Sequence, residues 1–520
     1  MESELDPKPV SVEAQPAADR FHDSERRFAN WLAFAFFVVV ALTMLRHEMW
    51  RDELEAFLAA RDSASAIDVV RNTRYNGHPV AWYLLLHAAT NITHDPRGMQ
   101  LLHACIATIG AYLLARFAPF SRLQRALLCF GYFPLFEYGV ISREYVLGVV
   151  MLFAFCAAYG AGAGVVVLAL LAGLLAQTSA YGLMISMALV AAVAVVRLLP
   201  RSMGVPLLHG RDGHATWIAL LIYVASVGLG VVQLIPPTDT GTVVGWGLPS
   251  WNMFPLVIIW RAIVPVPPID PHFWNENIVG GNKHAAPLGM LLWPVMFWML
   301  RKQRVALLLF GIGSIGLLTF AFVKFYGSIR HHGHVYLVLI AALWLAASHG
   351  RLSDHAAGLG KGLSRAFTVL LIVHVIGAAI AVSIDWVRPF SQSRATAAYL
   401  REHRLADAFL IGEKDTPTAP IAAYLDRPIY FPRGDRIGSY IIYDRKRLDY
   451  DPTTLLDVCR RKARENGDAV LLISTSKLRE LPPGVRPVGE LTGSIVGDED
   501  FWLYSVRPHL SATAATPPQR

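Results

Sequence analysis

Charged residues are scarce in this chain of 520 residues: they make up 17% of it, against about a quarter in an average soluble domain. There are only four cysteines, and Cys105, Cys129 and Cys156 lie in apolar runs, which excludes a disulfide framework and a CxxC metal site. A glycine-rich phosphate loop and internal repeats are also absent. The apolar content of 54% and the mean hydropathy of +0.40 exclude disorder and indicate a polytopic membrane protein.

About eleven apolar stretches predict membrane-spanning helices, since a bilayer core about 30 Å thick needs roughly 17–25 helical residues. They centre on Trp31–Leu45, Met99–Phe117, Arg125–Ile141, Tyr145–Tyr159, Gly164–Ala176, Leu183–Val196, Trp217–Leu234, Pro287–Leu300, Val305–Val323, Val335–Ala347 and Phe367–Ile384. The first is expected to be an uncleaved anchor, because no small-residue cleavage site follows it. Pro79–Ala89, which is too short to cross, and Phe254–Val266, which Arg261 interrupts, are predicted to lie at the membrane interface.

The net charge of +8 is explained by the expected membrane topology and does not indicate a nucleic-acid partner. Basic residues gather in the short loops on one side of the predicted spans. They include Arg116, Arg122 and Arg125 in one loop and Arg301, Lys302 and Arg304 in another. This positive-inside pattern predicts a multi-pass protein of the inner membrane whose N-terminus is cytoplasmic.

The same topology predicts three parts along the chain. Residues 1–29 form a cytoplasmic tail, residues 30–384 form a transmembrane domain with outer loops 46–98 and 235–286, and residues 385–520 form an extracytoplasmic α/β domain. In the last part we expect strands and helices in alternation. The strands are Ala408–Ile411, Ile429–Phe431, Tyr440–Tyr443, Ala469–Ser474 and Phe501–Val506, and the helices are Arg394–Glu402 and Thr453–Glu465.

Two acids, Asp52 and Glu53, directly follow the first predicted span, at the start of the first outer loop. A carboxylate fixed at membrane level can act as a general base or hold a cation. The alternative is a helix start in which Asp52 is the N-cap and Glu55 completes a capping box. The same loop ends with His78, directly before the first interfacial stretch.

Further ionisable residues occur at the outer ends of later spans. The second outer loop contains Arg143 and Glu144, with Glu137 about one helical turn earlier. Charge at this depth is costly unless it is paired or functional, so the alternative to a site is an ion pair that ties two helices together.

Near residue 330, two cations and three histidines stand within one short stretch. Lys324, Arg330 and His331 suit a phosphate head group, with Arg330 as the bidentate partner. His332 and His334 extend the histidine cluster, but HHxH lacks the spacing of a familiar zinc site. Ordinary snorkelling of the two cations to the interface is the competing interpretation.

The order of these motifs resembles the GT-C glycosyltransferases, in particular the bacterial branch of protein mannosyltransferase-like and aminoarabinose transferase-like enzymes (family 39-like). The motifs are an Asp-Glu pair after the first span, a His-Pro at the end of that loop, and Arg-Glu-Tyr in the second outer loop. The resemblance covers roughly residues 30–384. It implies transfer of a hexose or pentose from a polyprenyl-phosphate carrier to a lipid, glycan or protein acceptor at the outer face, with inversion.

The resemblance also implies residue roles. Asp52 matches the acid that acts as base or orients the acceptor, with Glu53 beside it, and His78 matches the residue before the family's proline. Arg143 and Glu144 match polar residues of the second loop. Val80 departs from the second proline that is often found in the family, and Glu144 departs from its usual aspartate. The implied donor is a polyprenyl-phosphate sugar; no cofactor is certain, and a divalent cation is left open because branches of the family differ.

Two other function classes remain as alternatives. A transporter or flippase of lipid-linked sugars predicts ionisable groups near the midplane and symmetry between halves, neither of which the sequence contains. A non-catalytic protein of envelope polysaccharide assembly would need neither Asp52 nor Arg330.

Overall fold

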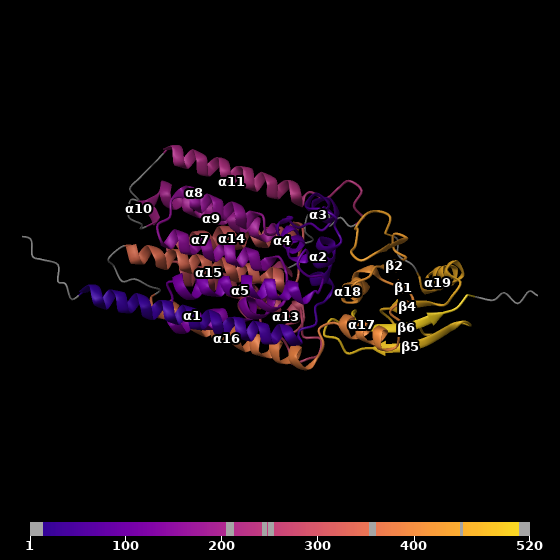
Figure 1. The fold of residues 1–520 in the computed structure, drawn as a ribbon. Helices are drawn as coiled ribbons and strands as arrows, with labels where there is room; N and C mark the ends of the chain where they lie inside the picture. The colour runs from indigo at the N-terminus through magenta and orange to yellow at the C-terminus, as the bar shows by residue number, and fades with distance from the viewer. Residues whose placement is uncertain are drawn as a thin grey trace, which may run out of the picture.

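The computed structural model describes residues 14–203, 213–241, 247, 254–352, 360–447 and 451–508. Residues 1–13 of the predicted tail, 242–246 and 248–253 of the second outer loop, and 509–520 at the C-terminus lie outside it. Long helices run side by side in a bundle, and a sheet with its own helices is attached to one end (Figure 1). The first helix, drawn in indigo, begins at the opposite end of the bundle.

Seven helices among the described residues are long and apolar enough to cross a membrane. They are α1 (Ala14–Arg46), α5 (Arg97–Phe117), α9 (Ala180–Leu198), α11 (Gly213–Leu234), α14 (Arg304–Val323), α15 (Ile329–Leu352) and α16 (Lys361–Val387). The spanning part of α15 is completely buried inside the bundle, whereas only 6% of that of α11 is buried. Because α11 is apolar throughout, its exposed surface suits lipid.

The count of about eleven spans is not confirmed. The predicted stretches fall largely in helices, but α7 (Tyr145–Gly160) and α8 (Val165–Ala176) have only 16 and 12 residues. The stretch Arg125–Ile141 divides into α6 (Arg122–Cys129) and a π-helix, η1 (Phe133–Val140). Pro134 near the start of η1 donates no backbone hydrogen bond, which disfavours a continuous α-helix.

The remaining helices of this part are shorter or interrupted. They are α2 (Arg51–Arg61), α3 (Ala66–Thr73), α4 (Ala81–Thr90), α10 (Pro200–Met203), α12 (Phe254–Ile263) and α13 (Asn282–Leu300). α13 has 19 residues, but Pro287 and Pro294 lie inside it. The two stretches predicted to lie at the interface form α4 and α12, each ten residues long, and α4 packs against α2.

The C-terminal part contains a six-stranded mixed sheet in the order β3-β2-β1-β4-β6-β5. The strands are β1 (Phe409–Gly412), β2 (Ile429–Phe431), β3 (Arg436–Gly438), β4 (Val470–Ser474), β5 (Val485–Leu491) and β6 (Phe501–Val506). β1 pairs in parallel with β2 and β4, and the other pairs are antiparallel. Its helices are α17 (Ser393–Glu402), α18 (Asp415–Leu425) and α19 (Pro452–Asn466). The α/β fold is therefore as predicted, but the strand expected at Tyr440–Tyr443 is wrong, because this segment pairs with no other strand.

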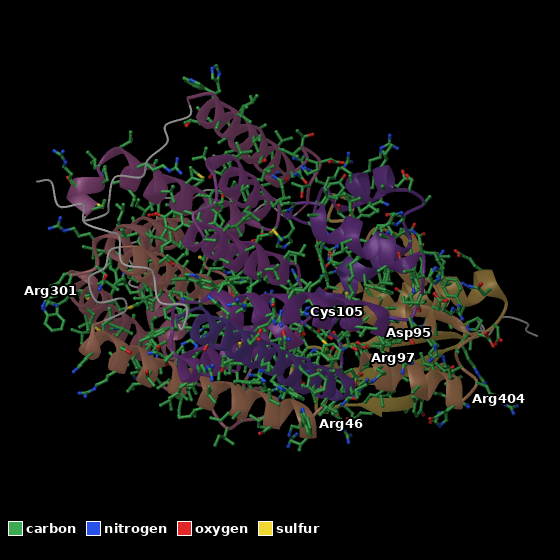
Figure 2. The ribbon with its side chains drawn as sticks, turned by 60° about the vertical axis from the view of Figure 1, so that its left-hand side comes forward. Arg46, Asp95, Arg97, Cys105, Arg301 and Arg404 are labelled. Carbon is green, nitrogen blue, oxygen red and sulfur yellow. The ribbon has the colours of Figure 1, made fainter. Side chains whose placement is uncertain are left out.

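The sheet domain is joined to the bundle through α18, which packs against α2. It therefore lies at the same end as the first loop after α1 (Figure 1). Arg301, in the basic loop between α13 and α14, lies at the far end of the bundle from Arg404 of the sheet domain (Figure 2). The bundle thus has two unlike ends, and the candidate site lies at the end that carries the sheet domain.

Candidate functional site

Asp52 and Glu53 both lie in the first turn of α2, but their side chains make different contacts. The helix begins at Arg51, and the Glu53 carboxylate accepts the backbone N–H of Trp50 at 3.2 Å. Acids in a first helical turn are favoured by the helix dipole. The alternative in which Asp52 caps this helix is wrong, since the capping carboxylate is Glu53. The Asp52 side chain is left for other contacts.

Asp52 is held by two arginines that come from distant parts of the sequence. Its Oδ2 accepts a hydrogen bond from Arg330 Nη2 at 2.6 Å and lies 3.2 Å from Arg143 Nη1. Arg143 Nη1 also donates to the backbone oxygen of Asp52 at 2.9 Å. The first outer loop, the second outer loop and the start of α15 therefore meet at one carboxylate.

Arg143 continues the network to two more predicted residues. Its Nε and Nη2 donate to the two carboxylate oxygens of Glu144, at 2.8 and 3.1 Å, in the bidentate geometry that makes arginine–carboxylate pairs strong. His78 Nδ1 lies 3.2 Å from Glu144 Oε1. The ion pair predicted in this loop is thus present, but it includes Asp52. Glu137 takes no part, because it accepts hydrogen bonds from Tyr132 and Trp274.

Charge balance sets the protonation of this network. Burial acts to raise the pKa of Asp52, but the guanidinium groups of Arg330 and Arg143 outweigh it and hold the pKa below its ordinary value. Burial opposes ionisation of Glu144 as well, and Arg143 and His78 again outweigh it and lower the pKa. Burial lowers the pKa of His78. Near pH 7 the network therefore holds two carboxylates, two guanidinium ions and a neutral imidazole.

Arg330 has unused hydrogen-bonding capacity, and so does His78, whose Nδ1 is also buried without a hydrogen-bond partner among the described residues. The guanidinium of Arg330 lies 5.4 Å from the ring centres of both Trp50 and Trp274, so that aromatic faces stabilise the cation. Nη2 is bound to Asp52, but Nε and Nη1 are buried and have no hydrogen-bond partner among the described residues. Buried donors without partners are uncommon and mark a place where a ligand or water is expected.

The turn before α15 fixes the position of Arg330. The Asn275 side chain accepts the backbone N–H of Ile329 at 3.1 Å, at the N-terminus of α15. Gly327 has φ +78°, and a side chain there would meet the ring of His331. Tyr138 of η1 donates to the Arg330 carbonyl oxygen at 2.7 Å. These contacts fix the main chain from which the Arg330 side chain reaches Asp52.

Three predicted residues lie outside this network. His331 accepts the Ser328 backbone N–H at Nδ1, which places its proton on Nε2, and Nε2 donates to the Tyr145 hydroxyl at 2.9 Å. Lys324 follows the end of α14 and is half-buried. Glu53, the third, is completely buried.

Glu53 belongs to a junction that also contains His47 and Asp385. His47 donates from Nε2 to Glu53 Oε2 at 3.0 Å and from Nδ1 to Asp385 Oδ2 at 2.9 Å. Glu53 Oε1 accepts the backbone N–H of Ser142 at 2.6 Å. Burial acts to lower the pKa of His47, but the two carboxylates outweigh it and raise it to about 10. This His47–Glu53–Asp385 junction ties α1, α2, the second outer loop and α16 together.

Several residues of the site region carry no sequence signal by themselves. Trp274 and Tyr443 come from segments with no recognisable motif, and only contacts between distant parts of the chain bring them to Arg330 and to Glu55. Glu55 had a usable signal, because residues three apart on a helix share a face, and Asp52 is three residues earlier.

No group of three or more His, Cys, Asp or Glu side chains among the described residues is arranged to hold a metal ion. The three histidines near residue 330 bind different partners: His332 lies against the Tyr326 carbonyl oxygen, and His334 Nδ1 lies 3.0 Å from the His331 carbonyl oxygen.

Comparison with known proteins gave no matching family model and no matching curated protein. The structure is similar to crystal structures of ArnT from Cupriavidus metallidurans, an aminoarabinose transferase of the GT-C class. With ArnT bound to undecaprenyl phosphate, the identity is 13% and the TM-score 0.48, over 94% of this chain and 99% of that chain. With ArnT in the apo state, the identity is 13% and the TM-score 0.32, over 92% and 87%. The chemistry below rests on this chain's own side chains.

Proposed function

We propose that this protein is a membrane glycosyltransferase that moves a sugar from a polyprenyl-phosphate carrier to a lipid, glycan or protein acceptor, with inversion. The observation that carries the proposal is Arg330. Its guanidinium lies beside two tryptophan rings that pack against each other, and two of its buried donors have no described partner, at the end of a bundle of apolar helices. A phosphate oxygen suits both unused donors, and the charge of a departing phosphate suits the cation.

Arg143 and Asp52 complete this phosphate site. Asp52 neutralises part of the charge of both guanidinium groups. Because both contact the same carboxylate oxygen, Asp52 also holds them close to each other. A preorganised pair of cations costs little reorganisation when negative charge develops on the leaving phosphate. Glu144 fixes Arg143 in the plane of a bidentate pair, and His78 borders Glu144 as a neutral hydrogen-bonding group. We also propose that Lys324, directly after α14, and His331, in the first turn of α15, border the bound phosphate.

The proposed face is the periplasmic or outer one. The bundle end that carries the sheet domain also carries α2, the helix of Asp52 (Figure 1), while Arg301 of the basic loop is at the other end (Figure 2). Since basic loops favour the cytoplasmic side, we propose that the N-terminus is cytoplasmic and that the sheet domain faces the periplasm of an inner-membrane protein.

Donor binding tests the phosphate site. Arg330→Ala is expected to weaken binding of undecaprenyl phosphate to the purified full chain by about ten- to over a hundredfold, since losing a charged hydrogen-bond partner costs ~1.5–3 kcal/mol. Binding is measured on protein in nanodiscs, and transfer is measured with a panel of undecaprenyl-phosphate-linked radiolabelled sugars and the host's envelope fraction as acceptor.

Arg301→Ala is the matched control, because Arg301 also lies over a tryptophan ring, that of Trp298, but at the far end of the bundle. It is expected to bind the carrier like the parent. Equal carrier binding by Arg330→Ala and the parent would place the phosphate elsewhere. A parent that transfers no sugar from any donor of the panel would contradict the proposed activity.

A further inference from the structure

Glu55 is a second carboxylate on the site-facing side of α2. It lies one helical turn after Asp52, and its side chain is partly exposed. Its Oε2 accepts a hydrogen bond from the Tyr443 hydroxyl at 2.9 Å, and no described residue donates to its Oε1. One oxygen is therefore positioned by the sheet domain, while the other is free to meet a substrate.

Asp52 is poorly arranged to accept a proton. Its Oδ2 is shared by Arg330 and Arg143, both within ion-pair distance. Protonating this carboxylate would remove the charge that balances two buried guanidinium groups, so its environment favours the ionised form strongly. A carboxylate that is stabilised as an anion is a weak base. The arrangement suits a fixed counter-charge better than proton transfer.

We propose that Glu55, and not Asp52, is the general base that takes the proton from the acceptor hydroxyl. This inference rests on the proposed function and assigns its base. Two observations carry it: the opposite contacts of the two carboxylates on one helix face, and the hydroxyl of Tyr443 that orients Glu55 from a different part of the chain.

The proposed step balances as follows. The acceptor O–H proton moves to Glu55 Oε1 while the hydroxyl oxygen forms a bond to the anomeric carbon of the sugar. The bond between that carbon and the phosphate oxygen breaks, and its electron pair remains on the phosphate, which Arg330 and Arg143 stabilise. Attack opposite to the leaving group inverts the anomeric carbon. Glu55 then loses its proton to water, and the products are glycosylated acceptor and polyprenyl phosphate.

The surroundings of Glu55 support this role. Charged and titratable groups face it from four segments: Asp52 on α2, Tyr83 on α4, Arg143 in the second outer loop, and Asp415, Tyr443 and Arg447 in the sheet domain. Burial, followed by the charge of Asp52, raises the pKa of Glu55 to about 7, against the opposing effects of Tyr443 and Arg143. A base with this pKa is both available and effective near neutral pH.

The contact with Tyr443 also indicates where the acceptor enters. Asp52 directs its oxygen toward the two arginines, whereas Glu55 lies against the segment that follows β3 in the sheet domain. The donor phosphate and the acceptor hydroxyl would then approach α2 from different directions, the first from the bundle and the second from the sheet domain. This geometry suits transfer between two substrates bound at once.

The test compares three variants of the purified full chain in nanodiscs: Glu55→Gln, Asp52→Asn, and Glu490→Gln as the control. Glu490 is an exposed acid on β5 that pairs with Lys477. We expect Glu55→Gln to bind undecaprenyl phosphate like the parent but to lower the turnover of sugar transfer by roughly 10²–10⁴, the range for losing a general base. Glu490→Gln is expected to behave like the parent in both assays.

The dependence of turnover on pH separates a base from a structural carboxylate. In the parent and in Asp52→Asn, turnover should rise with pH, with a midpoint near the pKa of Glu55. In Glu55→Gln, this rising limb of the pH–rate profile should be absent. Glu55→Asp should recover part of the rate with the limb still present. Parental turnover by Glu55→Gln, or loss of the limb in Asp52→Asn alone, overturns the assignment.

An infrared titration checks Glu55 without turnover. The infrared band of protonated carboxyl groups is measured against pH in the parent and in Glu55→Gln. The difference between the two proteins should titrate with a midpoint near pH 7. A midpoint near the pKa of an ordinary glutamate contradicts the proposal. Failure of the proposed function gives a different result. If the parent transfers no sugar, both the glycosyltransferase activity and the role of Glu55 are rejected. If the parent is active and Glu55→Gln is equally active, only the assignment of Glu55 as the base is rejected.

Discussion

Asp52 and Glu53 are neighbours in the sequence, but their side chains enter two regions of opposite character. Glu53 joins the His47–Glu53–Asp385 junction, where each side chain is at least 98% buried and both ring nitrogens of His47 have carboxylate partners. Asp52 joins a network that is partly open, with two arginine donors left without described partners. The comparison teaches that burial alone does not mark a functional acid; unsatisfied hydrogen-bonding capacity does.

The junction is expected to respond most strongly to mutation. His47→Ala leaves two carboxylates buried without their cation, and breaking a buried ion pair costs about 3–5 kcal/mol. We expect a correspondingly large loss of stability, measured by thermal unfolding of the purified protein in nanodiscs. A melting temperature equal to that of the parent would falsify the view that this junction holds the fold.

The same junction predicts a dependence of stability on pH. The pKa of His47 is raised in the folded protein, so its contribution is complete below the ordinary histidine value and declines as pH rises through about 10. The stability difference between parent and His47→Ala should therefore narrow between about pH 7 and pH 10.

The open network is expected to affect activity more than stability. Asp52→Asn keeps the size of the side chain but removes the charge that positions Arg143 and Arg330. Misplacing a catalytic group by about 1 Å costs roughly 10²-fold in rate, so we expect a loss of that order in sugar transfer. The melting temperature should fall much less than in His47→Ala. The reverse ranking of the two variants in stability would break the comparison between the regions.

The smallest effect is expected at Tyr443. Its hydrogen bond lowers the pKa of Glu55, so Tyr443→Phe should move the rising limb of the pH–rate profile to higher pH. The shift should be about one pH unit or less, because such a hydrogen bond contributes ~0.5–1.5 kcal/mol and one unit corresponds to about 1.4 kcal/mol. Tyr440→Phe is the control, since Tyr440 lies against Arg436 instead. If the rising limb of the pH–rate profile is not shifted in Tyr443→Phe, the Tyr443 hydroxyl does not affect the catalytic base.

Much of the fold follows from apolar patterns along the chain. The spans are readable because apolar runs end at charged residues, and β2 and β6 have the predicted bounds. β5 was missed because Pro487 and Gly489 interrupt its alternation, and the structure has an irregularity in the strand pairing there. α18 was missed because it contains two prolines, Pro417 and Pro420, which favour turns in a sequence without tertiary context.

The candidate site was predictable only where its residues border the spans. Asp52, His78, Arg143, Glu144 and Arg330 stand at the ends of apolar runs, and the structure brings these five together. The division of labour between Asp52 and Glu53 was not predictable, because it depends on His47 and Asp385, which are 338 residues apart. Local sequence cannot specify such pairing.

The two tryptophans around Arg330 have a practical consequence. Indole emission responds to charges and hydrogen bonds near the ring, and Trp50 and Trp274 have their ring centres 4.6 Å apart with the guanidinium beside both. An anion that draws the guanidinium toward itself changes the electric field at both indoles at once. If Arg330 binds the lipid phosphate as proposed, the emission of these two tryptophans reports that binding, and it can be measured before any sugar or acceptor is known.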